Sequence, residues 1–244
     1  MSGIVVGIPY YSNRAGLAFL MANLQPQMDE NDILYIVDDS PDKSGLEIAK
    51  MFASSRTLVL CDPTGGGKGI YNGWNYILQA MIDHKKDGAF IINDDVVLSM
   101  TCLSNLKRAH KITGDVYDCL VPKTPTREWN SKVLDPNFSW YSKVTTINDI
   151  KDTRWMAGFA FYLKREAIER VGLFNTDFDV WYGDTDMEDR VKGKIGLITN
   201  EYVYHYGGSS YQYKSPEVQK RIDVDRALYE KLKAKRTETN PSTV

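Results

Sequence analysis

The chain has 244 residues, 43% of them hydrophobic and 25% charged, a composition that excludes disorder over most of its length. Its formal net charge of -2 gives no overall positive field for nucleic acid, although 30 Lys and Arg residues leave room for a local basic groove. The sequence lacks the roughly 18 consecutive apolar residues of a membrane-spanning helix, and its 3 widely spaced cysteines indicate reduced thiols. We therefore expect a cytoplasmic protein without a membrane span.

Apolar strands and amphipathic helices alternate in the first 95 residues. Strands are predicted at residues 4–8, 33–37, 57–60 and 89–92, with helices at 17–24, 44–52 and 70–81. This alternation predicts an α/β fold with a mostly parallel central sheet flanked by helices. Ligands of such sheets bind beyond the carboxyl ends of the strands, so the polar residues directly after each apolar run are the candidate functional residues.

Acidic residues follow the second and the fourth predicted strand. Asp38 and Asp39 could accept hydrogen bonds from a uracil ring or a ribose hydroxyl, although Asp-Ser-Pro also forms a good turn. Asn93, Asp94 and Asp95 end the fourth strand. One carboxylate there could coordinate Mg2+ or Mn2+ beside a bound diphosphate, while its neighbours contact ribose or structure the turn. A solvated turn is the alternative at both places.

A glycine-rich turn at residues 65–69 precedes the helix at 70–81. It is not a P-loop, because Gly69 stands where Ser or Thr must follow the lysine, and Ile70 falls on the third glycine of the dinucleotide-binding pattern. A strand-to-helix turn of this kind could still present backbone N–H groups and Lys68 to phosphate or sugar. The alternative for Lys68 is an ordinary solvated lysine.

The second half of the sequence is less regular. Residues 122–153 are expected to form loops and short strands, a plausible acceptor-side insertion. Its aromatic and basic residues could stack on sugars or on unpaired bases: Lys123, Arg127, Trp129, Lys132, Trp140 and Lys143. Beyond it we predict a strand at 159–163, a helix at 165–171 and one or two strands at 195–204. Ser215 and Pro216 mark a helix start, and that helix is predicted to run to about Lys235.

Two further residues are candidates for chemistry. Asp184 lies in the acidic stretch 181–190, near the predicted N-terminus of a helix, and could act as the general base for an acceptor hydroxyl. An acidic helix start with a solvated face is the alternative. His205 ends an apolar-rich segment and could ligate a metal, although a lone histidine is usually structural. The other two, His84 and His110, fall on polar stretches of predicted helices and are expected at the surface.

In this order, the segments resemble glycosyltransferase family 2 and its GT-A relatives over about residues 4 to 210. The matching segments are 5–11 (first strand and nucleotide-binding turn), 36–40 (second strand and aspartates), 65–69 (glycine-rich stretch), 90–96 (place of the DXD motif), 158–161 and 171–174 (segments before the catalytic loop), 181–186 (ED-x-D stretch) and 204–205 (late metal-binding histidine). The sequence departs from the pattern at Asn93, which replaces the first DXD aspartate, and at Gly183, which replaces the glutamate before the base.

The resemblance implies roles for individual residues. The nucleotide site would include Pro9, Tyr11, Asp38, Asp39, Gly67, Lys68, Asn93 and Asp94. Mn2+ or Mg2+ would be held by Asp95 and His205, and Asp184 would be the base, with Asp186 as a second candidate. The implied reaction is an inverting displacement from a nucleoside-diphosphate sugar, with a UDP-sugar favoured. The acceptor hydroxyl would belong to a glycan, a lipid-linked intermediate, a protein or a hydroxylated base in nucleic acid.

The expected domain organisation is simple. One GT-A catalytic domain would cover 1–214, with a nucleotide-binding half at 1–100 and an acceptor and catalytic half at 101–214. A helix at 215–236 and a flexible tail at 237–244 would follow. A nucleotidyltransferase is disfavoured, because residues 9–14 do not form the glycine-rich loop with Arg and Lys that such enzymes carry after the first strand. A non-catalytic sugar- or nucleotide-binding module is the alternative from another class.

Overall fold

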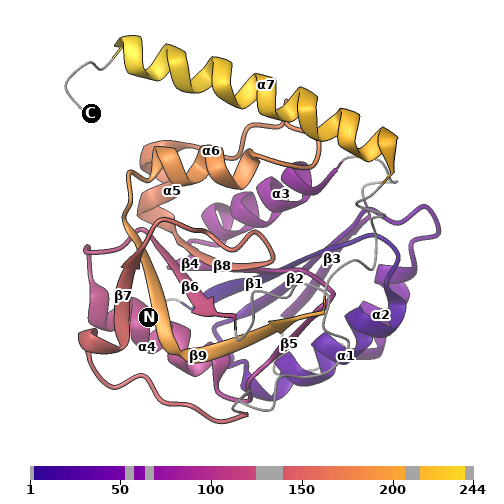
Figure 1. The fold of residues 1–244 in the computed structure, drawn as a ribbon. Helices are drawn as coiled ribbons and strands as arrows, with labels where there is room; N and C mark the ends of the chain where they lie inside the picture. Colours follow the sequence, from indigo (N-terminus) through magenta and orange to yellow (C-terminus); the bar gives the residue numbers. More distant parts are fainter. Residues whose placement is uncertain (1–2, 53–57, 64–68, 125–139, 207–214, 240–244) are drawn as a thin grey trace.

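The computed structural model describes residues 3–52, 58–63, 69–124, 140–206 and 215–239 (Figure 1). The N-terminal half is a run of parallel strands joined by helices, as the alternation predicts. Its strands are β1 (Ile4–Tyr10), β2 (Ile33–Asp38), β3 (Leu58–Pro63) and β4 (Gly88–Ile92), and its helices are α1 (Arg14–Leu24), α2 (Ser44–Phe52) and α3 (Ile70–Asp83). The strands lie in the order β3-β2-β1-β4, all parallel.

The second half extends the same sheet with mixed strand directions. Its strands are β5 (Val96–Leu98), β6 (Cys119–Lys123), β7 (Ile150–Thr153), β8 (Ala160–Lys164) and β9 (Ile195–His205), and its helices are α4 (Cys102–Thr113), α5 (Arg165–Val171), α6 (Gly183–Arg190) and α7 (Pro216–Thr239). Strand β8 runs antiparallel to both β4 and β6, and β6 pairs with β9 in parallel. The long strand β9 also pairs with β7 and β5, both antiparallel.

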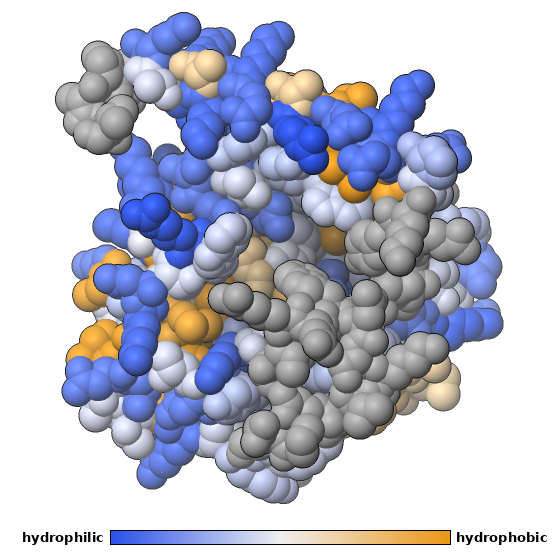
Figure 2. Space-filling model, in the orientation of Figure 1, coloured by the Kyte–Doolittle hydropathy of each residue, from blue (hydrophilic) through white to orange (hydrophobic). Residues whose placement is uncertain are grey.

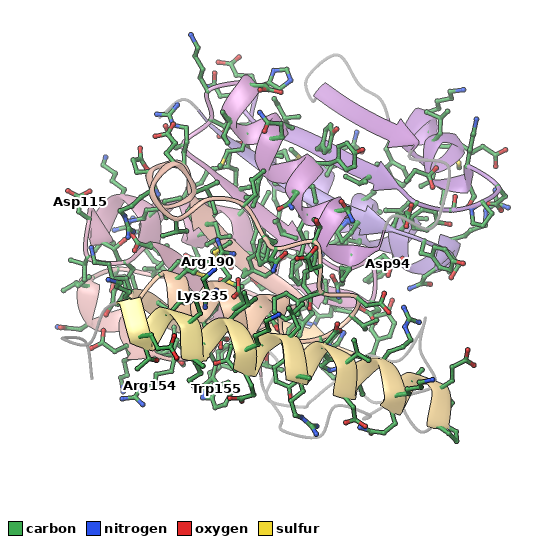
Figure 3. The ribbon with its side chains drawn as sticks, turned by 90° about the horizontal axis from the view of Figure 1, so that it is seen from above. Asp94, Asp115, Arg154, Trp155, Arg190 and Lys235 are labelled. Atoms are coloured by element: carbon green, nitrogen blue, oxygen red, sulfur yellow. The ribbon has the colours of Figure 1, made fainter. Side chains whose placement is uncertain are left out.

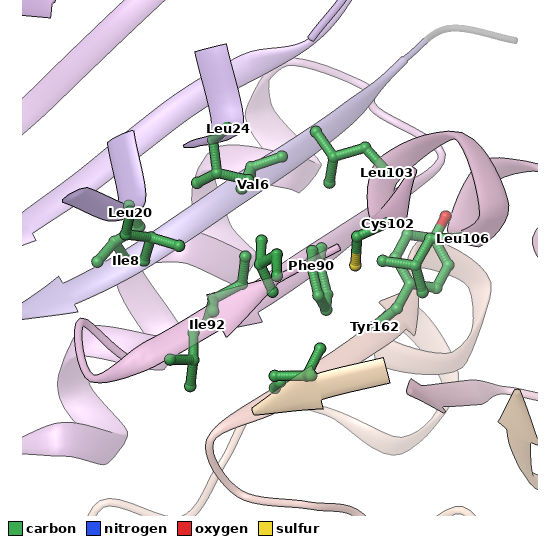
Figure 4. Packing of buried hydrophobic residues seen from close by; sticks show 14 of the residues in the cluster. Val6, Ile8, Leu20, Leu24, Phe90, Ile92, Cys102, Leu103, Leu106 and Tyr162 are labelled. Atoms are coloured by element: carbon green, nitrogen blue, oxygen red, sulfur yellow. The ribbon is translucent and has the colours of Figure 1, made fainter. Parts of the chain in front are cut away.

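Helices cover both faces of this sheet. Helices α1, α2 and α4 lie on one face, and α3, α5, α6 and α7 lie on the other (Figure 1). Successive side chains of a strand point to opposite faces, so Val5 joins one hydrophobic cluster while Val6 and Ile8 join the other. Figure 4 shows the second of these clusters, in which Leu20 of α1 and Leu103 of α4 pack with the strand residues. The apolar runs of the sequence are therefore buried on both faces of the sheet.

Some boundaries differ from the prediction. The C-terminal helix begins as expected, because Ser215 Oγ accepts a hydrogen bond from Val218 N at 3.2 Å. It continues to Thr239, however, beyond the end predicted at residue 236. The reason is tertiary: Arg236 forms an ion pair with Asp186 of α6, which keeps the last turns of the helix in place. Residues 240–244 lie outside the described part.

Two cysteines and one histidine of the second half are enclosed by the fold. Cys102 and Cys119 are free and buried, and burial raises the pKa of both thiols. His110 is not the surface residue expected, because its ring lies against Tyr162 with 3.1 Å between Nδ1 and the hydroxyl oxygen. Within the described ranges, none of the helices has the length and apolar character needed to cross a membrane.

Candidate functional site

The carboxyl ends of β1, β2 and β4, each followed by polar residues, lie next to one another on the same side of the sheet's strands, called here one edge of the sheet. Strand β1 pairs in parallel with β2 on one side and with β4 on the other. The strand order runs outward from β1 to β2 and β3 on one side and to β4 on the other, so the direction of winding changes between β1 and β4. Doubly wound sheets bind ligands at such a point. Asp39 N donates to Tyr10 O at 2.8 Å, so the last residue of β1 contacts the residue that follows β2. The topology confirms that these polar segments share an edge.

Asp38 and Asp39 have different surroundings. Asp38 is buried, and its carboxylate accepts hydrogen bonds from Ser40 N at 3.1 Å and Leu46 N at 2.9 Å. These bonds fasten the turn to the start of α2, so the turn interpretation fits Asp38 and its side chain faces inward. Asp39 Oδ2 instead accepts a hydrogen bond from Gly69 N at 3.2 Å, at the N-terminus of α3. Of the two, Asp39 is therefore the one placed beside the glycine-rich turn.

The turn at residues 93–95 is held from three sides. The backbone oxygen of Asp94 accepts hydrogen bonds from Asn13 Nδ2 at 3.1 Å and from the Tyr206 hydroxyl at 3.3 Å. Asn93 N donates to Phe159 O at 2.9 Å. Burial, together with the neighbouring charge of Asp95, raises the pKa of the Asp94 carboxyl to about 7. The backbone oxygen of Asp94 thus anchors the turn, and its carboxyl is enclosed next to Asp95.

Asp95 and His205 lie side by side, although 110 residues separate them. Antiparallel pairing of β5 with β9 sets Val96 opposite His205, and His205 Nε2 lies 3.1 Å from Asp95 Oδ1. The imidazole also stacks on Phe159, with ring centroids 4.2 Å apart and an angle of 8° between the planes. The side chains proposed from the sequence as metal ligands are therefore neighbours.

Helix α6 carries both candidate bases. A Cβ placed on Gly158 would lie 2.6 Å from Asp184 Oδ2, so this carboxylate rests directly against the backbone of Gly158. Desolvation by the surrounding protein raises the pKa of Asp184. Asp186 is different: its side chain is 1% exposed and lies between Arg190, at 2.9 Å, and Arg236. Two guanidinium groups engage Asp186, which leaves Asp184 as the better placed base.

Glu188 is a functional candidate that the sequence reasoning missed. It lies one helical turn after Asp184, on the same side of α6, and accepts a hydrogen bond from Met156 N. Desolvation, with a smaller contribution from the charge of Asp184, raises the pKa of Glu188 to about 7. The i, i+4 spacing from Asp184 was the available signal. A second carboxyl with a perturbed pKa therefore lies near the candidate base.

Residues 156–159 contact candidate residues from α6, from the turn after β4 and from β9. Met156 contacts Glu188, Gly158 contacts Asp184, and Phe159 contacts both Asn93 and His205. This short segment precedes β8, the antiparallel strand beside β4. The carboxylate of α6, the turn after β4 and the histidine of β9 consequently surround one piece of backbone.

The remaining predicted residues are placed as follows. Tyr11 is exposed just beyond β1, and Pro9 lies near Gly73 of α3. Gly67 and Lys68 lie outside the described residues, as do Arg127, Trp129 and Lys132. In the same acceptor-side stretch, Lys123 lies over the ring of Tyr202, with 5.3 Å from Nζ to the centroid. Trp155 was not singled out from the sequence, but it is 76% exposed immediately before residues 156–159 (Figure 3).

Comparison with known proteins identifies the architecture. No family model and no curated protein matches the sequence. Among solved structures, the chain is similar to GalNAc-T7 with UDP, GalNAc and Mn2+, with a TM-score of 0.65 and 15% identity over 88% of this chain and 45% of that one. It is also similar to the mannosyltransferase PcManGT from Pyrobaculum calidifontis with GDP-Man and Mn2+, with a TM-score of 0.58 and 17% identity. The chain has the GT-A fold.

A third GT-A neighbour is S. aureus TarS, with a TM-score of 0.59 and 14% identity over 84% of this chain. The chain spans 57% of the length of PcManGT and 37% of TarS, so these neighbours carry further parts. At such identities the likeness concerns the fold. It confirms the α/β architecture with a largely parallel central sheet that was predicted from the sequence.

Proposed function

We propose that the chain is a glycosyltransferase that moves one sugar from a nucleoside-diphosphate sugar to an acceptor hydroxyl with inversion. The observation that carries this proposal is the convergence of Asp95, Asp184 and His205 around residues 156–159. Asp95 and His205 are neighbours, and Asp184 and His205 both contact residues 156–159, near the carboxyl ends of the strands where such sheets bind ligands. Neighbours of the same fold hold GDP-Man with Mn2+ and UDP with Mn2+, which supports this donor class.

The donor atoms of Asp95 and His205 suit a divalent cation. Asp95 Oδ1 and His205 Nε2 lie 3.1 Å apart, and a carboxylate oxygen and an imidazole nitrogen are donors that such a cation accepts. Among the described residues, no group of three or more His, Cys, Asp or Glu side chains gathers to hold a metal. We infer that Asp95 and His205 would hold Mn2+ or Mg2+ beside the diphosphate of the donor. A cation bound there supplies positive charge that offsets the charge of the diphosphate.

The chain's own residues account for the other parts of the reaction. Asp184 Oδ2 takes the proton of the acceptor hydroxyl while the hydroxyl oxygen forms a bond to the anomeric carbon of the sugar. The bond between the anomeric carbon and the diphosphate oxygen breaks on the opposite side. Because desolvation raises its pKa, Asp184 is a stronger base than an exposed aspartate. Asp39, beside the N-terminus of α3, and Asn93 are proposed to contact the nucleoside, for which we favour a UDP-sugar.

The acceptor is proposed only as a molecule that offers a hydroxyl group. A glycan, a lipid-linked intermediate, a protein or a hydroxylated base all offer the hydroxyl that Asp184 requires. Trp155 presents a largely exposed indole next to residues 156–159, and an aromatic face there can stack on a sugar ring or on a base. We place the acceptor on this side of the site.

The proposal is tested by assaying hydrolysis of UDP-glucose, UDP-N-acetylglucosamine and GDP-mannose with Mn2+, and with EDTA. We expect turnover that EDTA abolishes and Mn2+ restores. Asp95→Asn and His205→Ala should each weaken Mn2+-dependent nucleotide binding in calorimetry by about tenfold or more, because each removes one of two protein ligands. The exposed residues Asp115 and His84 provide matched controls, Asp115→Asn and His84→Ala, which should bind as the wild type does.

Two results would contradict the proposal. Nucleotide binding without turnover of any donor would favour the non-catalytic module. Full turnover in EDTA would remove the cation from the reaction.

A further inference from the structure

One carboxylate of the C-terminal helix is buried against the segment that leads into α6. Asp225 of α7 is 1% exposed. Its carboxylate accepts hydrogen bonds from three successive backbone N–H groups: Asp179 N at 3.0 Å, Val180 N at 2.9 Å and Trp181 N at 2.9 Å. A buried carboxylate is stable only when such donors compensate its charge. Asp225 therefore fixes residues 179–181, which come directly before α6.

The same segment is fixed from its other side by Tyr71 of α3. The Tyr71 hydroxyl donates to Val180 O at 2.9 Å and accepts from Gly183 N at 3.0 Å. Between these two points Tyr182 adopts a left-handed conformation, with φ of 65°. Gly183 packs closely on Tyr71, since an added Cβ would lie 2.4 Å from the ring. The chain thus enters α6 along a path set by Asp225 and Tyr71, and Asp184 is the second residue of that helix.

The docking of α7 does not depend on Asp225 alone. Near its C-terminal end, Arg236 pairs with Asp186, and the Tyr229 hydroxyl donates to Asp189 Oδ2 at 2.9 Å. Seen from above, α7 crosses over the part of the molecule that contains Arg190 (Figure 3). Without the Asp225 carboxylate, α7 keeps these contacts to α6 while residues 179–181 lose their acceptor.

We propose that Asp225 is a positioning residue for the general base: it sets the backbone path into α6 and thereby the location of the Asp184 carboxylate. This inference rests on the proposed function and adds the C-terminal helix to the catalytic apparatus. A displacement of about 1 Å at a reacting group can cost about 100-fold in rate. Loss of Asp225 therefore acts on turnover more than on donor binding, because the nucleotide and cation residues proposed above lie on other elements.

The test compares Asp225→Asn with Asp223→Asn, a control on the same helix. Asp223 is exposed, and its carboxylate pairs with Arg226 Nη1 of the same helix at 3.2 Å, while Arg226 Nε donates separately to the Tyr182 hydroxyl at 2.9 Å. The assay measures hydrolysis of the donor that the wild type uses. We expect Asp225→Asn to lower kcat by about 10- to 100-fold, while KM for that donor stays within about twofold of the wild-type value. Hydrogen exchange of the amides at 179–181 should become faster. Asp223→Asn should change neither, and Asp225→Glu, which restores the charge, should recover part of the lost kcat.

The outcomes separate this inference from the function itself. If the wild type turns over no donor, the proposed function fails and the inference fails with it. If the wild type is active and Asp225→Asn retains its kcat, only the inference is overturned. A KM that rises as much as kcat falls, or loss of the folded state in both Asp225 variants, would also overturn it, because Asp225 would then act on binding or on folding in general.

Discussion

At the scale of residues, identical side chains have different surroundings on one helix. Asp184 and Asp186 lie two positions apart on α6, yet only Asp186 is engaged by two arginines. A similar contrast separates Asp38, which is buried in a turn, from Asp39, which reaches Gly69. In both pairs the surroundings decide whether a carboxylate is engaged by the structure around it or stays a candidate for the proposed chemistry.

The assignment of Asp184 as base predicts a specific loss of turnover. Asp184→Asn keeps the shape of the side chain but removes its ability to take a proton, so kcat should fall by about 10²- to 10⁴-fold. Binding of UDP with Mn2+, measured by calorimetry, should stay close to the wild-type value. Asp177→Asn, at an exposed position in the loop before α6, is the matched control. An unchanged kcat in Asp184→Asn would move the base elsewhere.

The raised pKa of Glu188 predicts a pH-dependent contribution to stability. Its pKa is about 7 in the folded protein against an ordinary value of 4.5, so the folded state binds the proton more tightly. Its contribution to stability is therefore full below the ordinary value, declines as pH rises through this window and levels off above about pH 7. Glu188→Gln removes this pH-dependent contribution to stability, while the glutamine side chain can still accept a hydrogen bond from the N–H of Met156. Relative to the wild type, its Tm should rise between about pH 5 and about pH 8, and parallel Tm curves would contradict the prediction.

At the scale of elements, α7 shows how a mostly polar helix can be held in place. Figure 2 shows predominantly hydrophilic side chains over its outer surface. Few of its side chains are fully buried, and Val218 and Tyr229 are its buried hydrophobic residues. Ion pairs and hydrogen bonds to α6 and to residues 179–181 supplement this narrow apolar contact. The helix is therefore attached by specific polar partners as well as by hydrophobic area.

The pair between α6 and α7 predicts a measurable loss of stability. Arg236→Ala leaves the buried Asp186 with Arg190 alone, and a hydrogen bond to a charged group contributes about 1.5–3 kcal/mol. We expect the free energy of unfolding in urea to fall by about that amount. Glu169→Ala removes a partly exposed i, i+4 pair with Arg165 and should cost less than about 0.5 kcal/mol. Equal losses in the two variants would show that the α6–α7 pair has no special weight.

At the scale of the whole molecule, the sheet gathers residues that are far apart in the sequence. The order β3-β2-β1-β4 brings the ends of β1, β2 and β4 to one edge, and β9 returns along β5 to add His205. Residues 156–159 then connect this edge to α6. The site is thus a product of topology, since no local segment contains more than a part of it.

The sequence alone determined the fold class and most of the candidate residues. Apolar runs, helical spacing and the polar residues after each strand are local patterns, and secondary structure follows such patterns directly. The three-residue strand β5 was not predicted, because so short an element has no readable period. The full extent of α7 was also missed, because its last turns depend on a partner in α6.

Only the tertiary structure decided which candidates meet and which are occupied elsewhere. Asp95 and His205 became neighbours through strand pairing, Asp186 pairs with Arg190 and Arg236, and Glu188 and Asp225 accept backbone hydrogen bonds that no motif indicated. The physical reason is that desolvation and pairing of a charged side chain depend on groups brought close by the fold, whatever their distance along the chain.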